Sequence, residues 1–239
     1  MLKNILKILA VFIIAMVGGI FSEQIVWPYL VEKPLFYRYG LEQAPVHITE
    51  TKEITIQENT ALQEAIKGVE SSIIAVRTVD SHKNVIEGSG FVISSDGLII
   101  TLAELVPVGS DFSFFIGEEK QSYEIQKRDI KNNLALVKLE KTNFNAVDFG
   151  NIGEKEIGER IFLVGTIFDE KGEISKMTNE GIIKYFKEDF IHTNIFENEI
   201  ASGSSVFDIQ GKILGLSEID EQGKLVVLPI SLIREFSGF

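Results

Sequence analysis

The fold is decided by the stretch from Gly88 to Thr101, which reads GSGFVISSDGLIIT. Apolar residues, several of them β-branched or aromatic, fill both halves of this stretch and favour extended strands. Ser95-Asp96-Gly97 separates the halves, and an Asp-Gly pair tolerates the positive φ that a tight hairpin requires. The stretch therefore predicts two antiparallel strands joined by a short turn.

The same pattern of short apolar runs between turn residues continues on both sides of this hairpin. The first group of predicted strands is Ser72–Thr78, Gly90–Ser94, Leu98–Leu102, Asp111–Ile116, Gln121–Lys127 and Leu134–Leu139. The second group is Arg160–Ile167, Gly181–Phe186, Phe190–Thr193, Ser204–Asp208, Ile213–Ile219 and Leu225–Leu228. Amphipathic spacing predicts a helix over Thr60–Val69, and a last helix is predicted over Ser231–Phe236 with Ser231 as its N-cap.

The two groups of strands indicate the fold class. Each group holds about six short strands, which is enough for a small antiparallel barrel. A polar linker near Phe149–Gly158 joins the groups. We therefore predict an all-β fold, a double β-barrel of two packed Greek-key barrels with about six strands each, over residues 60–239. The first barrel is expected over 70–148 and the second over 156–239.

The composition restricts the chemistry of the chain. Its 239 residues include 23 Lys and Arg against 35 Asp and Glu, so the formal net charge is −12 at pH 7. A surface this acidic repels phosphate backbones and argues against nucleic-acid binding. Cys is absent and the 3 His, His47, His82 and His192, are scattered, so we predict neither disulfides nor a zinc site. No cofactor and no metal are expected.

Residues 1–22 are predicted to form a transmembrane signal-anchor. Lys3 and Lys7 carry the only charged side chains in this segment. The run from Ile5 to Phe21 is about 17 residues long, the short end of a bilayer-spanning helix, with Lys7 reaching back to the headgroups. A basic flank stays on the cytoplasmic side, so the domain is expected outside the cytoplasm. The alternative is a cleaved signal peptide, with Gly18-Gly19-Ile20 as the nearest candidate cleavage site.

Residues 23–59 are predicted to form an extracytoplasmic spacer. Regular structure in it is interrupted by Pro28, Pro34 and Pro45. Trp27 and Tyr29 lie where an interfacial aromatic belt would follow the membrane segment. Phe36-Tyr37-Arg38-Tyr39 is an aromatic cluster that is expected to contact the domain, the membrane or a neighbouring subunit.

Six motifs follow one another along the domain. They are Gly88–Thr101, Asp129–Leu139, Ile157–Gly165, Thr178–Asn194, Ser202–Asp208 and Gly211–Leu216. Together they resemble the trypsin-like serine proteases, specifically the Do/HtrA type of bacterial envelopes. The resemblance covers about residues 61–239 and implies a double β-barrel with its active site in the cleft between the barrels. Because the chain ends after the second barrel, we expect it to lack the PDZ modules that often follow in this family.

The resemblance also implies an assembly. Envelope proteases of this type commonly form trimers through aromatic residues near the N-terminus. Phe36-Tyr37-Arg38-Tyr39 is the candidate for that contact here, in a homo-trimer or in a hetero-trimer with active relatives.

Four positions of the expected active site follow from the resemblance. Serine acyl transfer requires a nucleophilic hydroxyl, a base of near-neutral pKa, a carboxylate that orients this base, and backbone N–H donors for the oxyanion. The nucleophile position is Ser202. Glu104 stands where the family has the histidine base, and Asn133 stands where it has the aspartate. Ile200 replaces a glycine of the oxyanion hole.

These replacements predict that peptidase activity is lost. A glutamate with an ordinary pKa of about 4.3 is a poor base for an alcohol at pH 7. Neutral Asn133 cannot balance an imidazolium, and β-branched Ile200 resists backbone conformations that glycine permits. Loss of one triad member typically lowers kcat by about 10⁴-fold. A hydrogen bond between Glu104 and Asn133 would replace the one between histidine and aspartate; alternatively, Glu104 is a solvated acid at a strand corner.

Other interpretations of the serine loop stay open. Ser202 suits a tight loop of small residues whether or not it reacts. A slip in the match would make Ser204 the nucleophile, although this breaks the register with Val206-Phe207-Asp208. His192 is the only histidine of the second barrel and would be a substitute base, although the family has a structural residue at this place.

The sequence thus predicts a membrane-anchored pseudoprotease outside the cytoplasm. Its inter-barrel cleft would take an extended peptide or protein segment by strand addition, which uses backbone hydrogen bonds and needs no triad. One alternative is an active serine endopeptidase with an unconventional site that uses Ser202. Another is a structural envelope β-domain without protease ancestry, in which Glu104, Asn133 and Ser202 would not converge at one cleft.

Overall fold

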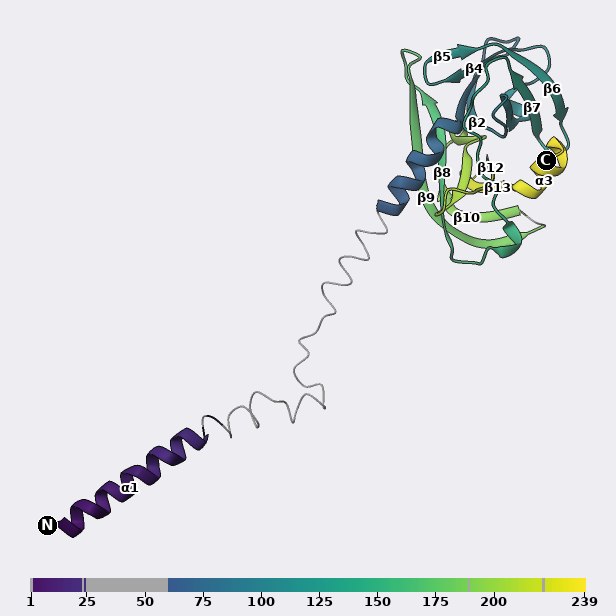
Figure 1. Ribbon diagram of the computed structural model, residues 1–239. Coiled ribbons are helices and arrows are strands. Elements are labelled where there is room, and N and C mark those ends of the chain that lie inside the picture. The colour runs from purple at the N-terminus through teal and green to yellow at the C-terminus, as the bar shows by residue number, and fades with distance from the viewer. Residues whose placement is uncertain (1, 23, 25–59, 189, 221) are drawn as a thin grey trace. The chain divides into compact units, whose positions relative to one another are not determined.

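The computed structural model describes residues 2–22, 24, 60–188, 190–220 and 222–239 (Figure 1). The chain divides into two units, Met1–Ile56 and Gln57–Phe239. The described part of the first unit is mainly the helix α1 (Leu2–Phe21), whose large apolar side chains from Ile8 onward are more than half exposed. Among the residues placed in the structure, no helix is both long enough and apolar enough to cross a membrane.

Most of the predicted spacer lies outside the described residues. This applies to Trp27, Tyr29, Pro28, Pro34, Pro45, Phe36-Tyr37-Arg38-Tyr39 and His47. The expectations for these residues therefore stay predictions.

The second unit begins with the predicted helix, observed over residues 60–69, and continues into a seven-stranded antiparallel sheet. Its strands are β1 (Ile73–Val79), β2 (Val85–Val92), β3 (Leu98–Leu102), β4 (Asp111–Ile116), β5 (Glu119–Gln121), β6 (Tyr123–Asp129) and β7 (Leu134–Leu139). Their order across the sheet is β5-β4-β1-β2-β3-β7-β6. The predicted bounds of β3, β4 and β7 are confirmed. Gly97 has a φ of 96° in the predicted turn between β2 and β3.

Two features of this sheet correct the prediction. The predicted strand Gln121–Lys127 is divided, because β5 pairs with β4 whereas β6 pairs with β7 at the other edge of the sheet. Within the described residues, β5 and β6 remain the two edges and the sheet does not close. The first half of the domain is therefore a half-barrel of seven strands, and not a closed barrel of about six.

The second half is a closed six-stranded barrel, as predicted. Its strands are β8 (Arg160–Phe168), β9 (Ile174–Lys187), β10 (Phe190–Phe196), β11 (Ser205–Asp208), β12 (Ile213–Ile219) and β13 (Lys224–Pro229). They close in the order β10-β13-β12-β11-β8-β9. β9 is longer than the predicted Gly181–Phe186, because its polar first half pairs with β8 before the strand reaches β10. A polar, partly exposed strand has no apolar run that would reveal it in the sequence.

The described chain ends in the helix α3 (Ile230–Ser237), and its N-cap is Pro229. The prediction that Ser231 caps this helix is wrong. Pro229 is also the last residue of β13, so the strand passes directly into the helix and Ser231 already lies inside the first turn. Ile233 and Phe236 are buried and attach the helix to the core.

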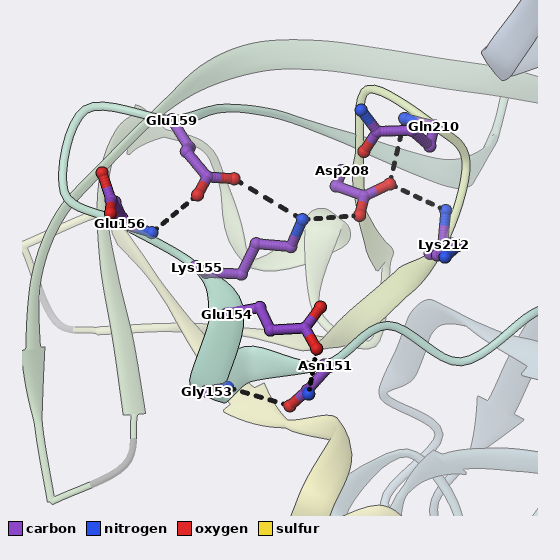
Figure 2. A network of polar contacts seen from close by, with 9 residues as sticks. All are labelled: Asn151, Gly153, Glu154, Lys155, Glu156, Glu159, Asp208, Gln210 and Lys212. Carbon is purple, nitrogen blue, oxygen red and sulfur yellow. Dashed lines mark hydrogen bonds and ion pairs between the residues drawn. The ribbon is translucent and has the colours of Figure 1, made fainter.

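The linker between the halves is attached to the barrel by a buried ion pair (Figure 2). Lys155 follows the short 3₁₀ helix η6 (Ile152–Glu154), and its Nζ lies 2.9 Å from Oδ2 of Asp208 at the end of β11. Asp208 is 2% exposed, and its Oδ1 accepts two backbone N–H groups of the following turn. Burial lowers the pKa of Lys155, but its pairing with Asp208 and Glu159 outweighs burial, so the pKa is raised overall.

The two halves of the domain pack through one apolar core and a polar seam. Phe91 of the half-barrel and Phe162 and Phe207 of the closed barrel are fully buried in the same cluster. In the seam, the hydroxyls of Ser89 on β2 and Thr166 on β8 lie 3.0 Å apart, and the N–H of Thr166 donates to Oγ of Ser89 at 2.8 Å. The seam therefore brings β2 against the closed barrel, next to the loop that carries Ser202.

Candidate active site

Glu104 and Asn133 lie together at the corner where β3 ends and β7 begins. Glu104 belongs to the short 3₁₀ helix η5 (Ala103–Leu105), which follows β3. Its backbone N–H donates to Oδ1 of Asn133 at 3.0 Å, and the N–H of Ala103 donates to the Asn133 carbonyl oxygen at 3.1 Å. A hydrogen bond therefore joins the two predicted positions, through the backbone of Glu104.

Asn133 suits this corner better than the aspartate of an ordinary triad. Its φ of 50° lies in the left-handed region, which asparagine tolerates better than most residues. Its amide Nδ2 donates to Oε1 of Glu218 on β12 at 2.9 Å. An ionised aspartate has no proton to donate there. Asn133 thus connects the half-barrel to Glu218 without placing two negative charges side by side.

Ser202 follows the short 3₁₀ helix η7 (Glu199–Ala201), and backbone hydrogen bonds hold it on both sides. Its N–H donates to the carbonyl oxygen of Glu199 at 2.9 Å. Its own carbonyl oxygen accepts the N–H of Ser89 from β2 at 3.1 Å. The serine loop is therefore attached to the half-barrel as well as to its own barrel, and Ser202 is only 8% exposed.

Glu104, Ile200 and Ser202 line one pocket of about 470 Å³ between the two halves of the domain. The lining residues are Val85, Ile86, Glu87, Glu104, Leu105, Glu199, Ile200, Ser202 and Ile219. Asn133 does not line this pocket, and its Oδ1 accepts the backbone N–H of Glu104. The predicted positions therefore converge, which is the arrangement expected of a protease cleft rather than of an unrelated barrel.

The Ser202 hydroxyl has no hydrogen-bond partner among the described residues. Neither Glu104 nor His192 accepts its proton in this arrangement. The loop also withholds one of the two backbone N–H groups that usually bind the oxyanion, because the N–H of Ser202 is already donated to Glu199. The site thus keeps a nucleophile position without the base contact and without a free N–H at the serine.

The surroundings of Glu104 raise the pKa of its carboxyl. Partial burial against the pocket walls raises its pKa, although the residue remains exposed at the pocket mouth. The Asn133 side chain lowers the pKa by hydrogen bonding, and the negative charges of Glu218 and Glu199 raise it again. The net shift is upward, so the expectation of an ordinary glutamate pKa is wrong. Glu104 is a better proton acceptor near neutral pH than a free glutamate.

The alternative residues do not lie in this pocket. Ser204 is fully buried against Gly165, where its Oγ would be 2.0 Å from a Cβ added to that glycine. His192 lies on β10 and stacks on Tyr185 with 4.3 Å between ring centroids. Burial, and then the charge of Lys187, lower the pKa of His192. Within the described residues, no group of acidic or histidine side chains is arranged to hold a metal ion.

Comparison with known proteins agrees with this geometry. Residues 88–216, more than half of the chain, match the family model of the trypsin-like peptidase domain. The chain belongs to the trypsin-like peptidase family. Within that family it is similar to the probable periplasmic serine endoprotease DegP-like of Bartonella henselae, at 29% identity over 136 residues, which are 54% of this chain and 27% of the relative. The protein of the same description from Chlamydia muridarum is 27% identical over 143 residues, which are 57% of this chain and 29% of that protein.

The solved structures show the same trypsin-like fold. The structure of the HtrA-type protease AlgW with a tripeptide has a TM-score of 0.66 and 20% identity. The alignment covers 74% of this chain and 62% of that chain. The chain spans less than a third of the length of the curated trypsin-like relatives named above.

Three acidic residues near this trypsin-like site were missed by the sequence prediction. They are Glu87, Glu199 and Glu218. Glu87 directly precedes the motif at Gly88, and Glu199 directly precedes Ile200. Their position next to residues of the motifs could have predicted that they lie beside the site. Glu218 reaches Asn133 across the two halves of the domain, and no spacing within one motif indicates such a contact.

Proposed function

We propose that this chain is a catalytically inactive HtrA-type peptidase domain that binds an extended peptide or protein segment. The observation that carries the proposal is the hydrogen bonding of Ser202. Its hydroxyl has no partner among the described residues, and its N–H is donated to the Glu199 carbonyl. Acyl transfer needs a proton acceptor at the hydroxyl and N–H donors at the oxyanion, and a single oxyanion donor is worth about 10²–10³-fold in kcat.

An open strand edge supports peptide binding in the same cleft. The N–H of Ser217 donates to Ser204 and its carbonyl oxygen accepts from Gly203, so its polar groups point away from β13. The direction of the backbone N–H and carbonyl groups alternates from residue to residue along a strand. Ile219 lies two residues after Ser217, so its N–H and carbonyl also point away from β13. β11 pairs with β12 only as far as Leu216, so no described strand occupies the edge at Ile219. An extended peptide added there would lie beside the pocket.

A fluorophosphonate probe tests the loss of catalysis. We expect no labelling of the purified chain above that of Ser202→Ala, because an unactivated serine hydroxyl reacts slowly. An active trypsin-like protease in the same assay shows that the probe works. Labelling that disappears in Ser202→Ala would overturn the proposal and establish an activated nucleophile.

One observation favours a second candidate, a serine endopeptidase in which Glu104 is the base. Glu104 and Ser202 line the same pocket, and the pKa of Glu104 is raised towards the range of a general base. This candidate predicts fluorophosphonate labelling that is lost in Ser202→Ala and also in Glu104→Gln. The inactive domain predicts no labelling in any of the three proteins.

We also propose that the N-terminal segment holds the domain at a membrane, on the extracytoplasmic side. The apolar run with its basic flank supports this, as do the exposed apolar side chains of α1 and the word periplasmic in the names of the relatives. Carbonate extraction of membranes should leave the full chain in the pellet and release residues 60–239. An N-terminus near residue 20 in the mature protein would favour the cleaved signal peptide instead. A trimer formed through Phe36-Tyr37-Arg38-Tyr39 stays part of the proposal.

A further inference from the structure

The pocket beside Ser202 has an unbalanced negative charge. Glu104 and Glu199 both line it, and neither forms an ion pair within the described part of the chain. Glu87 also lines it, but Arg77 neutralises this carboxylate with Nη2 at 2.6 Å from Oε1. None of the described residues that line the pocket is lysine, arginine or histidine. The charges of Glu104 and Glu199 are close enough to act on one another, since Glu199 contributes to the raised pKa of Glu104.

A second feature of the pocket points to a ligand independently of its charge. Ser202 is 8% exposed, lines the pocket, and has a hydroxyl with no partner in the described residues. The Ser202 hydroxyl is not among the fully buried side-chain atoms that lack a partner in the described residues, so a group inside the pocket can reach it. A polar group that enters the pocket would form a hydrogen bond with this hydroxyl and would also contact the carboxylates of Glu104 and Glu199.

The remaining wall of the pocket is apolar. Val85 and Ile200 expose 56% and 42% of their surface, and Leu105 and Ile219 complete this side. An apolar wall that leads to carboxylates suits a long side chain with a methylene stem and a cationic head. A guanidinium carries five N–H donors and can reach two carboxylates and a hydroxyl together.

From these observations we infer that the pocket binds the arginine or lysine side chain of a peptide held in the cleft. The inference rests on the proposed peptide binding and names the chemistry of the bound segment. The stem of the basic residue lies along Val85 and Ile200, and its head lies between Glu104 and Glu199. Glu104 stands at the base position and Glu199 lies on the serine loop, so the preference uses one of the replacements that remove catalysis.

A peptide library tests the inference on the full chain. Capped octapeptides, with one position at a time fixed as arginine, citrulline, glutamate or leucine, are bound to the protein and read by fluorescence anisotropy. Citrulline has the shape of arginine without the charge. We expect one position at which arginine binds about tenfold more tightly than citrulline, and glutamate binds worst. In Glu104→Gln/Glu199→Gln this ratio should fall below about twofold, while leucine pools keep their affinity.

A matched control and the contrary outcomes make the test decisive. Glu170→Gln/Glu173→Gln makes the same change of charge on the exposed turn between β8 and β9, so its arginine preference should equal that of the unaltered chain. Binding without an arginine preference, or a preference that survives the double substitution, would overturn the inference and leave peptide binding intact. If no pool binds at all, peptide binding itself fails and the inference fails with it.

Discussion

At the residue scale, Gly203 shows why the serine loop has its local sequence. Its φ is +74°, and an added Cβ would lie 2.3 Å from the carbonyl oxygen of Ser89. Gly109 has a similar φ of +85° but nothing within 4 Å of an added Cβ. We predict that Gly203→Ala lowers the free energy of unfolding by about 3 kcal/mol and Gly109→Ala by about 1 kcal/mol. Urea denaturation measures both, and equal losses would contradict the proposed backbone clash.

Glu104 gives a second prediction at this scale, because its raised pKa links stability to pH. The folded state favours the protonated carboxyl, so this contribution is present below the ordinary glutamate pKa and is lost as pH rises through the higher folded value. Ionised Glu104 therefore destabilises the fold at pH 7, and Glu104→Gln should raise Tm there by about 1–2 °C. The gain should vanish below about pH 4, where both states are protonated.

Thermal unfolding at a series of pH values measures this difference. Glu170→Gln is the control, since Glu170 lies on an exposed turn away from the pocket. Its Tm should follow that of the unaltered chain across the whole range. A gain from Glu104→Gln that is the same at pH 4 and pH 7 would mean that the charge of Glu104 is not its source.

At the scale of elements, the ion pair of Lys155 fastens the linker to β11 (Figure 2). The Lys155 and Asp208 side chains are 13% and 2% exposed, so removal of the lysine leaves a buried, unpaired carboxylate. We predict that Lys155→Met costs about 3–5 kcal/mol of unfolding free energy. Lys155→Met/Asp208→Asn should recover most of this loss, because asparagine keeps an acceptor for the backbone N–H groups without the charge. A loss below about 1 kcal/mol in the single variant would refute the role of the pair.

The elements also show which parts of the fold a sequence can reveal. β3, β4, β7 and β12 were predicted with their observed bounds, since each is an apolar run bounded by turn residues. The polar first half of β9 was missed, and β5 and β6 were merged, because pairing partners elsewhere in the sheet define these strands. Local sequence patterns predict the buried strands, whereas the bounds of edge strands depend on their pairing partners in the rest of the fold.

At the scale of the whole domain, the site exists only where the two halves meet. Glu104 and Leu105 come from the half-barrel, and Ser202 and Ile219 come from the closed barrel. The resemblance located the positions of Ser202 and Glu104 because Ser202 begins one motif and Glu104 is the third residue after the motif that ends at Thr101. The capture of the Ser202 N–H by Glu199 depends on the backbone path of η7, and the Asn133–Glu218 bond crosses the two halves. Neither hydrogen bond can be predicted from the spacing of residues along the chain.

Because both halves of the domain contribute to the site, we can predict how it responds when the usual triad residues are restored. Glu104→His with Asn133→Asp restores the usual base and its orienting carboxylate, but we expect no measurable peptidase activity. The new carboxylate would face Glu218, which now accepts the Asn133 amide, and the N–H of Ser202 would still be donated to Glu199. Ile200→Gly relaxes the loop and permits the backbone conformation that frees oxyanion donors.

Turnover of a fluorogenic peptide measures the effect of the third substitution, Ile200→Gly. Addition of Ile200→Gly to the double variant should raise turnover by at least about 100-fold, the effect of one oxyanion donor. The control is the triple variant with Ser202→Ala, which must be inactive. Activity already present in Glu104→His/Asn133→Asp would mean that the loop opens its N–H donors when substrate binds. The cleft would then retain a working oxyanion site, and the missing base alone would account for any loss of catalysis.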